Sequence, residues 1–121
     1  MQKKILIVDD EEDVRLFLAD FIGDLDFCVD TAVDGLEAIE KTVRTQYDVV
    51  LLDVMMPRMD GIACLEKIKK LSPETAIIMI TALMDEKRMS AAKKLGAAQY
   101  IVKPFSLNYL ETELLNLLGK S

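Results

Sequence analysis

The stretch Lys4-Ile5-Leu6-Ile7-Val8-Asp9-Asp10 decides the fold, because a short apolar run ends abruptly in two carboxylates. A continuous run of this kind, rich in β-branched residues, is typical of a strand that is buried on both faces. The pattern returns in Val49-Val50-Leu51-Leu52-Asp53 and in Ala76-Ile77-Ile78-Met79-Ile80-Thr81. A fourth run, Tyr100-Ile101-Val102, ends in Lys103-Pro104. These runs predict buried parallel strands that end in polar side chains.

Helical patterns separate the strands. In three of them apolar residues recur every three or four positions, which gives the helix one apolar face. The predicted core-facing residues are Val14, Phe17, Leu18, Phe21, Ile22 and Leu25; Leu36, Ile39 and Val43; and Leu107, Leu110, Leu114, Leu117 and Leu118. Two less regular segments end close to Pro73 and Gly96, residues that commonly follow a helix.

This alternation predicts one α/β domain over residues 1–121, built from five strand–helix units. A weaker run, Phe27 to Thr31, alternates apolar and polar residues and therefore suits an edge strand. We expect a flavodoxin-like (βα)5 fold, with a five-stranded parallel sheet in the order 2-1-3-4-5 and helices on both faces. The expected strands are about 4–8, 27–31, 48–52, 76–80 and 99–102, and the expected helices about 11–24, 35–45, 61–71, 85–95 and 107–118.

Composition and charge exclude several classes of protein. The net charge is −6 and no basic stretch exceeds a lysine pair, so direct nucleic-acid binding is not expected. No apolar run approaches the roughly 18 residues of a membrane span, and the N-terminal run is too short for a signal peptide. A cytoplasmic location is therefore predicted. The chain has no histidine, which excludes His-based catalysis and histidine metal ligands. Cys28 and Cys64 lie among apolar residues, and we expect both to be buried and reduced.

The polar residues at the strand ends form the candidate site. In a parallel sheet Asp9-Asp10, Asp53, Thr81 and Lys103 all end at one edge, so their side chains are expected to converge. Any one of them could be polar simply because strand ends meet solvent. As a set, however, the three carboxylates would be neighbours, and each pair about 5 Å apart repels by roughly 3 kcal/mol at an effective dielectric constant near 20. Oxygen ligands without histidine favour Mg²⁺ over softer metals, with Ca²⁺ as the competing ion. A carboxylate next to Mg²⁺ and a lysine is suited to phosphoryl transfer.

At these residues the sequence resembles the receiver family of two-component signalling, of the single-receiver type found in chemotaxis and sporulation. The resemblance covers nearly the whole chain. Its motifs are Ile5 to Asp10, Asp53 to Gly61, Thr81-Ala82, Gly96-Ala97 and Tyr100 to Phe105.

The resemblance implies a role for each matching residue. Asp53 is expected to be the phosphoacceptor, and Lys103 to pair with a phosphoryl oxygen across a cis bond to Pro104. Thr81 and Tyr100 are expected to act as the switch pair, although a tyrosine also suits a strand by propensity. The expected Mg²⁺ ligands, with Mn²⁺ as a substitute ion, are Asp9, Asp10, Asp53 and the backbone carbonyl of Met55. Met55 and Leu83 are apolar and flank the approach to Asp53, so we expect slow loss of the phosphoryl group.

The resemblance also implies partners. A histidine kinase or histidine phosphotransfer protein is expected to bind through Leu16 on the first helix and the loop at Pro104 and Phe105. An output protein or an appended effector domain is expected to bind the surface of the fourth helix, fifth strand and fifth helix. The protein is expected to be a monomer or a phosphorylation-dependent dimer, either alone or as part of a longer regulator.

Three other functions compete with this interpretation. A phosphatase of the haloacid dehalogenase kind needs a second aspartate two residues after its nucleophile, where this chain has Met55. A flavodoxin-type cofactor protein needs a hydroxyl- and glycine-rich phosphate loop, where this chain has Asp9-Asp10-Glu11-Glu12. A pseudo-receiver would lack part of the acceptor set, which is complete here. We therefore predict a switch that assists only its own phosphorylation, and not an enzyme with a separate substrate.

Overall fold

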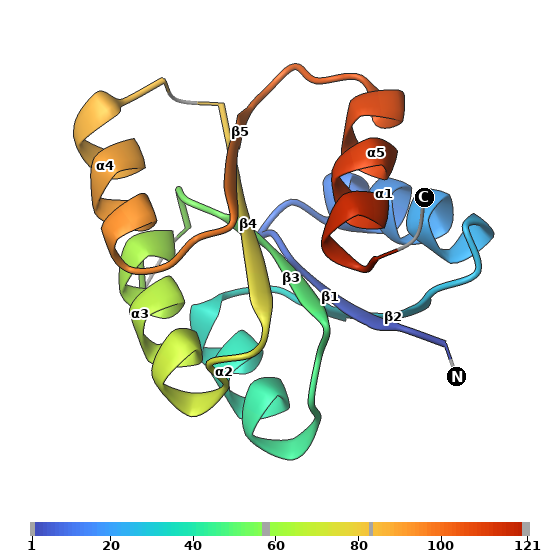
Figure 1. Cartoon of the computed structure of the whole chain (residues 1–121), viewed down its shortest axis with the longest axis horizontal. Helices are drawn as coiled ribbons and strands as arrows, with labels where there is room; N and C mark the ends of the chain where they lie inside the picture. The colour runs from blue at the N-terminus through green and yellow to red at the C-terminus, as the bar shows by residue number, and fades with distance from the viewer. Residues whose placement is uncertain (1, 57–58, 83, 120–121) are drawn as a thin grey trace.

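The computed structural model describes residues 2–56, 59–82 and 84–119. Strands and helices alternate along the chain, and the five parallel strands have the order β2-β1-β3-β4-β5 (Figure 1). The elements are β1 Lys4–Val8, α1 Glu12–Asp24, β2 Cys28–Ala32, α2 Gly35–Arg44, β3 Val49–Asp53, α3 Gly61–Leu71, β4 Ala76–Thr81, α4 Glu86–Lys94, β5 Gln99–Val102 and α5 Leu107–Leu117. The predicted fold class and strand order are confirmed, and the predicted element bounds differ by no more than one residue at any end.

Two cores lie on opposite faces of the sheet, because side chains of a strand alternate between its faces. Leu6 and Val8 of β1 belong to the core beneath α2, α3 and α4. Ile5 and Ile7 belong to the core beneath α1 and α5. All four side chains are at most 1% exposed. Complete burial of such a side chain contributes about 1.5–3 kcal/mol, so these central strands hold the sheet edge firmly in place.

Side-chain caps set the start of four helices. Asp34, Asp60, Asp85 and Ser106 each accept a hydrogen bond from a backbone N–H in the first turn of the helix that follows. Such a cap contributes about 1 kcal/mol to helix stability. Asp60 caps α3, which begins at Gly61 as the expected helix over residues 61–71 does.

The predicted apolar face of α2 is only partly right: Ile39 packs against the core, but Leu36 and Val43 do not. Leu36 and Val43 are 49% and 67% exposed, whereas α2 buries Gly35, Ala38 and Thr42. The reason is close packing between α2 and α3: a Cβ atom on Gly35 would lie 3.4 Å from the Sγ of Cys64 in α3, and 3.3 Å from the sulfur of Met59 just before that helix. Small residues must face inward where two helices approach so closely, and this leaves the larger apolar residues of α2 outside.

The burial predictions for Phe17, Cys28 and Leu117 are also wrong. Phe17 of α1 is 57% exposed, although it follows the spacing of the buried residues Leu18 and Ile22. Cys28 is exposed because it is the first residue of the edge strand β2, while Cys64 is buried as predicted. At the end of α5, Leu117 is 37% exposed and only partly covered.

Candidate functional site

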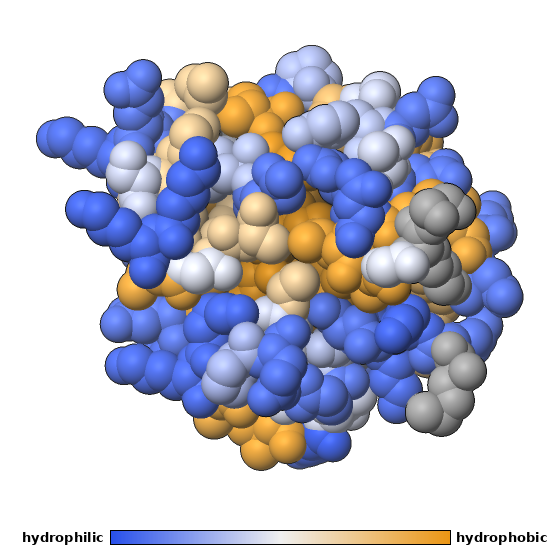
Figure 2. Space-filling model, in the orientation of Figure 1, coloured by the Kyte–Doolittle hydropathy of each residue, from blue (hydrophilic) through white to orange (hydrophobic). Residues whose placement is uncertain are grey.

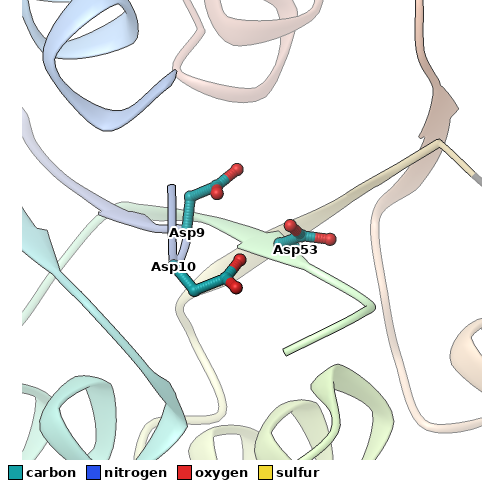
Figure 3. Close-up of side chains that lie close together, drawn as sticks. All are labelled: Asp9, Asp10 and Asp53. Atoms are coloured by element: carbon teal, nitrogen blue, oxygen red, sulfur yellow. The ribbon is translucent and has the colours of Figure 1, made fainter. Parts of the chain in front are cut away.

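The predicted polar residues do meet at one edge of the sheet. Asp9 follows β1, Asp53 is the last residue of β3, Thr81 is the last residue of β4, and Lys103 follows β5. Figure 3 shows the side chains of Asp9, Asp10 and Asp53 pointing into the same space from two neighbouring strands. The parallel pairing of β1 with β3 creates this meeting, because it aligns Val8 with Leu52 and so brings the next residues of both strands together.

The three aspartates form a tight carboxylate cluster. One oxygen from each of Asp9, Asp10 and Asp53 lies within 4.8 Å of the others. Asp9 and Asp53 are 3% and 7% exposed, while Asp10 faces solvent. Backbone N–H groups hold the two buried carboxylates: that of Glu11 donates to Asp9 Oδ1 (2.9 Å) and that of Met55 to Asp53 Oδ1 (3.0 Å).

Lys103 is the cation closest to this cluster among the described residues. Its Nζ lies 3.4 Å from Asp9 Oδ2, and its side chain is only a quarter exposed. One ammonium group faces three carboxylates, so the cluster keeps an excess of negative charge.

The pKa of Asp53 is raised in this environment. Burial is the main cause, the charges of Asp9 and Asp10 add to it, and the pKa reaches about 6 from an ordinary value of 3.8. The Met55 N–H and Lys103 oppose the shift only in part. An additional cation would relieve the repulsion, and oxygen ligands alone suit a hard divalent ion. The acidic cluster is thus suited to a divalent metal.

A hollow of about 360 Å³ gives access to the cluster. It is lined by Asp10, Glu11, Asp53, Met55, Ala82 and Lys103. Met55 is half-exposed at its mouth, as expected for a residue that flanks the approach to Asp53. Leu83, the second flanking residue of that prediction, lies outside the described residues, as do Pro57 and Arg58 of the Asp53 motif.

Thr81 and Tyr100 lie behind this hollow and do not line it. Thr81 is fully buried, and its backbone carbonyl accepts a hydrogen bond from the Lys103 N–H (2.7 Å). Tyr100 is partly buried against the core beneath α2, α3 and α4. Burial raises the pKa of Tyr100, and the charge of Asp85 raises it further. This backbone hydrogen bond therefore connects Thr81 to the end of β5, whereas Tyr100, within β5, lies farther from the acidic cluster.

Comparison with known proteins identifies the family. The sequence profile of the response regulator receiver domain matches residues 5–115. The chain belongs to this family. It is 37% identical to the chemotaxis protein CheY of Thermotoga maritima, over 99% of this chain and 100% of that protein. It is 41% identical to the transcriptional regulatory protein ResD of Bacillus subtilis, over 87% of this chain but 43% of ResD. The chain spans about half the length of several such regulators.

Solved structures agree with this assignment. The chain is similar to the structure of a CheX–CheY–BeF3–Mg complex from Borrelia burgdorferi, with a TM-score of 0.90 and 34% identity over 96% of this chain and 89% of that one. The receiver assignment makes this chain a response-regulator receiver domain, not a classical enzyme. It also removes the phosphatase and flavodoxin alternatives.

The receiver domain has a second hollow, which is apolar and lies beside the site. This groove of about 550 Å³ runs between α1 and the loop that precedes α5, and its walls include Val14, Phe17, Pro104 and Phe105. The Lys103–Pro104 bond in this loop is cis, as predicted. Leu16 is 55% exposed but does not line the groove; its neighbour Phe17 does.

Sequence reasoning missed two contacts that support the site. The Arg15 guanidinium donates to the backbone carbonyl of Asp9 (2.8 Å) and ties α1 to the end of β1. The backbone of Gly61 packs directly on Asp53 and Val54, since a Cβ atom there would lie 2.4 Å from the Asp53 carbonyl oxygen. The sequence predicted a helix from Gly61, but nothing in the sequence placed the start of that helix against Asp53.

No described helix is long and apolar enough to cross a membrane.

Proposed function

We propose that this receiver domain is a phosphoacceptor switch of a cytoplasmic two-component or phosphorelay system, with Asp53 as the acceptor. The observation that supports this most directly is the position of Asp53. Its carboxylate is buried at the end of the central strand β3, belongs to the acidic cluster and opens onto the hollow that Lys103 also lines.

The proposed transfer needs no general base, because Asp53 reacts as the carboxylate. An oxygen of Asp53 forms a bond to phosphorus while the bond from phosphorus to the donor breaks, and the leaving group departs with that electron pair. Lys103 pairs with a phosphoryl oxygen, and the Thr81 hydroxyl, which lies behind the hollow, turns toward the phosphoryl group to donate a hydrogen bond to another oxygen. The proposed magnesium ligands are Asp9, Asp10, Asp53 and the Met55 carbonyl, with Mn²⁺ as a substitute ion. When bound, the ion supplies positive charge to the phosphoryl oxygens.

Incubation with acetyl phosphate tests this assignment. Intact-mass measurement is expected to show one added phosphoryl group in the presence of Mg²⁺ and none after chelation. Asp53→Asn should abolish the addition because the attacking oxygen is lost. Asp20→Asn, an exposed change on α1, is the matched control and should be labelled like the wild type. Unchanged labelling of Asp53→Asn would refute the acceptor.

The proposed output is a change in the surface formed by α4, β5 and α5, which an output protein or an appended effector domain would contact. Its support is the Thr81–Lys103 backbone hydrogen bond, which joins the site to β5. With beryllofluoride as a phosphoryl mimic, amide NMR shifts are expected to change along α4 and β5, and less so in Thr81→Ala. Shifts confined to the loops around Asp53 would contradict the switch role of Thr81 and Tyr100.

The proposed donor is a histidine kinase or histidine phosphotransfer protein that binds the apolar groove beside the site. Support comes from the half-exposed Phe17, which together with Pro104 and Phe105 leaves apolar surface open next to Lys103. Leu16 lies on the same helix and extends this surface. A partner bound there would bring its phosphorylated side chain to the mouth of the acidic hollow.

A further inference from the structure

The helices of this receiver domain divide its charge between two sides. α3 and α4 carry seven basic and two acidic side chains, a net charge of +5. α1 and α5 carry one basic and six acidic side chains, a net charge of −5. Neither set of charges is needed for the proposed phosphoryl chemistry, because the site uses residues at the strand ends.

The two charged pairs of helices lie on opposite faces of the sheet. Figure 1 shows α3 and α4 on one side and α1 and α5 on the other, in agreement with the two separate cores. Hydrophilic side chains project from the side where α3 and α4 lie (Figure 2). The exposed basic side chains of α3 and α4 include Lys67, Lys70, Lys87 and Lys94. On the opposite side, the exposed acidic side chains of α1 include Asp13, Asp20 and Asp24.

Contacts within the chain neutralise little of the basic side. Among the described residues, Lys70 pairs with Glu66 at 3.8 Å and Arg88 with Asp85 at 3.0 Å. No comparable pair holds Lys67 or Lys94 within the described part of the chain. Several lysines thus offer their charge to a molecule outside the chain.

We propose that the basic face of α3 and α4 binds the acidic face of α1 and α5 on a second copy of this chain. The two faces have charges of opposite sign and equal size, +5 and −5. A long polyanion such as duplex DNA fits less well. The chain outside α3 and α4 has a net charge of −11, since the whole chain has −6 and these two helices have +5, and this charge would repel DNA that extends beyond the basic face. At physiological salt charges beyond about 8 Å are screened, so facing patches attract despite the net charge.

The geometry makes this association head-to-tail and open-ended, because each copy uses two different faces. Exposed ion pairs are individually weak, so we expect a dissociation constant of roughly a millimolar. The association does not depend on Mg²⁺ or on Asp53, and its failure would leave the phosphoacceptor proposal untouched. It also differs from a phosphorylation-dependent dimer. Since Phe17 lies between Asp13 and Asp20 on α1, a bound copy would compete with a partner in the apolar groove.

Light scattering at about 1 mM protein tests the proposal, with NaCl raised from about 100 to about 500 mM, so that the net repulsion is screened over about 10 Å even at the lower concentration. The weight-average mass should exceed the monomer value of 13.6 kDa at low salt and return to it at high salt. Two variants remove most of the charge of one face each. Lys67→Glu with Lys94→Glu lowers the net charge of α3 and α4 from +5 to +1, and Asp20→Lys with Asp24→Lys changes that of α1 and α5 from −5 to −1. Each variant alone should remain monomeric. Their equimolar mixture should form pairs, because the intact acidic face of the lysine variant then meets the intact basic face of the aspartate variant. Circular dichroism would verify that both variants fold.

The aspartate variant separates patch attraction from net charge. It lowers the overall negative charge, so net repulsion alone predicts that it associates more strongly than the wild type, whereas facing patches predict that it associates less. Lys4→Glu with Arg44→Glu changes the net charge as the lysine variant does, but leaves α3 and α4 intact, and should still associate. A wild type that is monomeric at the lower salt concentration would overturn the proposal. So would a lysine variant or an aspartate variant that associates as strongly as the wild type. Binding of a short DNA duplex by a monomeric wild type would assign the basic face to nucleic acid instead.

Discussion

At the scale of single residues, Asp53 shows how a functional charge reduces stability. The pKa of its carboxyl is raised from 3.8 to about 6, chiefly by burial. A carboxyl whose pKa is higher in the folded than in the unfolded state binds its proton more tightly in the folded state. Its contribution to stability is therefore complete below the unfolded pKa and is lost as pH rises through the folded pKa. Without metal, the stability of the protein should therefore fall between about pH 4 and pH 6, by at most about 3 kcal/mol from this residue.

Asp53→Asn removes that effect, because a neutral amide has no charge to bury. In urea unfolding with a chelator present, the variant should be more stable than the wild type at pH 7, and the difference should disappear near pH 4. Asp20→Asn, at an exposed position of α1, should show no such pH-dependent gain. Equal stability of Asp53→Asn and the wild type at pH 7 would mean that the buried charge of Asp53 does not lower the free energy of unfolding.

The sequence predicted which residues meet at the site better than it predicted their contacts. Asp9, Asp53 and Lys103 could be placed together because each ends a buried parallel strand, and parallel strands end at one edge. The Arg15 bond to the Asp9 carbonyl could not be foreseen, because it depends on how α1 sits over β1. Phe17 and Cys28 were misplaced for a similar reason: local spacing does not reveal whether a neighbouring element covers a position.

At the scale of elements, strands were more predictable than helix faces. The central strands are apolar except for one polar residue at an end of each, so the burial of their apolar residues follows from composition alone. α2 is the instructive failure, since its buried face consists of Gly35, Ala38 and Thr42. Periodicity of large apolar residues marks a helix, but the closeness of a neighbouring helix decides which face turns inward. That distance is a property of the packed molecule.

The start of α3 provides an element-scale prediction. A Cβ atom on Gly61 would lie 2.4 Å from the Asp53 carbonyl oxygen and 2.6 Å from the Val54 Cα, and backbone atoms cannot yield. Gly61→Ala should therefore lower the free energy of unfolding by about 1–3 kcal/mol, since α3 must move away from β3. Gly23→Ala is the matched control: nothing lies within 4 Å of its Cβ position, and helical alanine should add about 0.5–1 kcal/mol. Denaturant unfolding of both variants measures this, and a neutral Gly61→Ala would show that α3 can shift freely.

At the scale of the whole molecule, the fold places different properties on different sides. The sheet edge collects carboxylates, the groove beside it is apolar, and the helices on the two faces carry opposite charge. The edge could be predicted from the order of strands and helices. The division of charge could not, because α3 and α4 become neighbours only after right-handed crossovers put them on one face. The net charge of −6 conceals it.

Magnesium should stabilise the whole domain, because the ion binds carboxylates that only the folded sheet assembles. At 100 times its dissociation constant a bound ligand adds about 2.7 kcal/mol to the free energy of unfolding. The melting temperature should therefore rise with MgCl₂, and Asp10→Asn should lose most of the gain because a proposed ligand is removed. NaCl at matched ionic strength is the necessary control, since screening alone weakens the repulsion among the three aspartates. An equal rise with NaCl, or an undiminished rise in Asp10→Asn, would contradict a metal site at this cluster. A rise specific to Mg²⁺ and dependent on Asp10 would support the proposed role of the cluster as a metal site, independently of any phosphoryl donor.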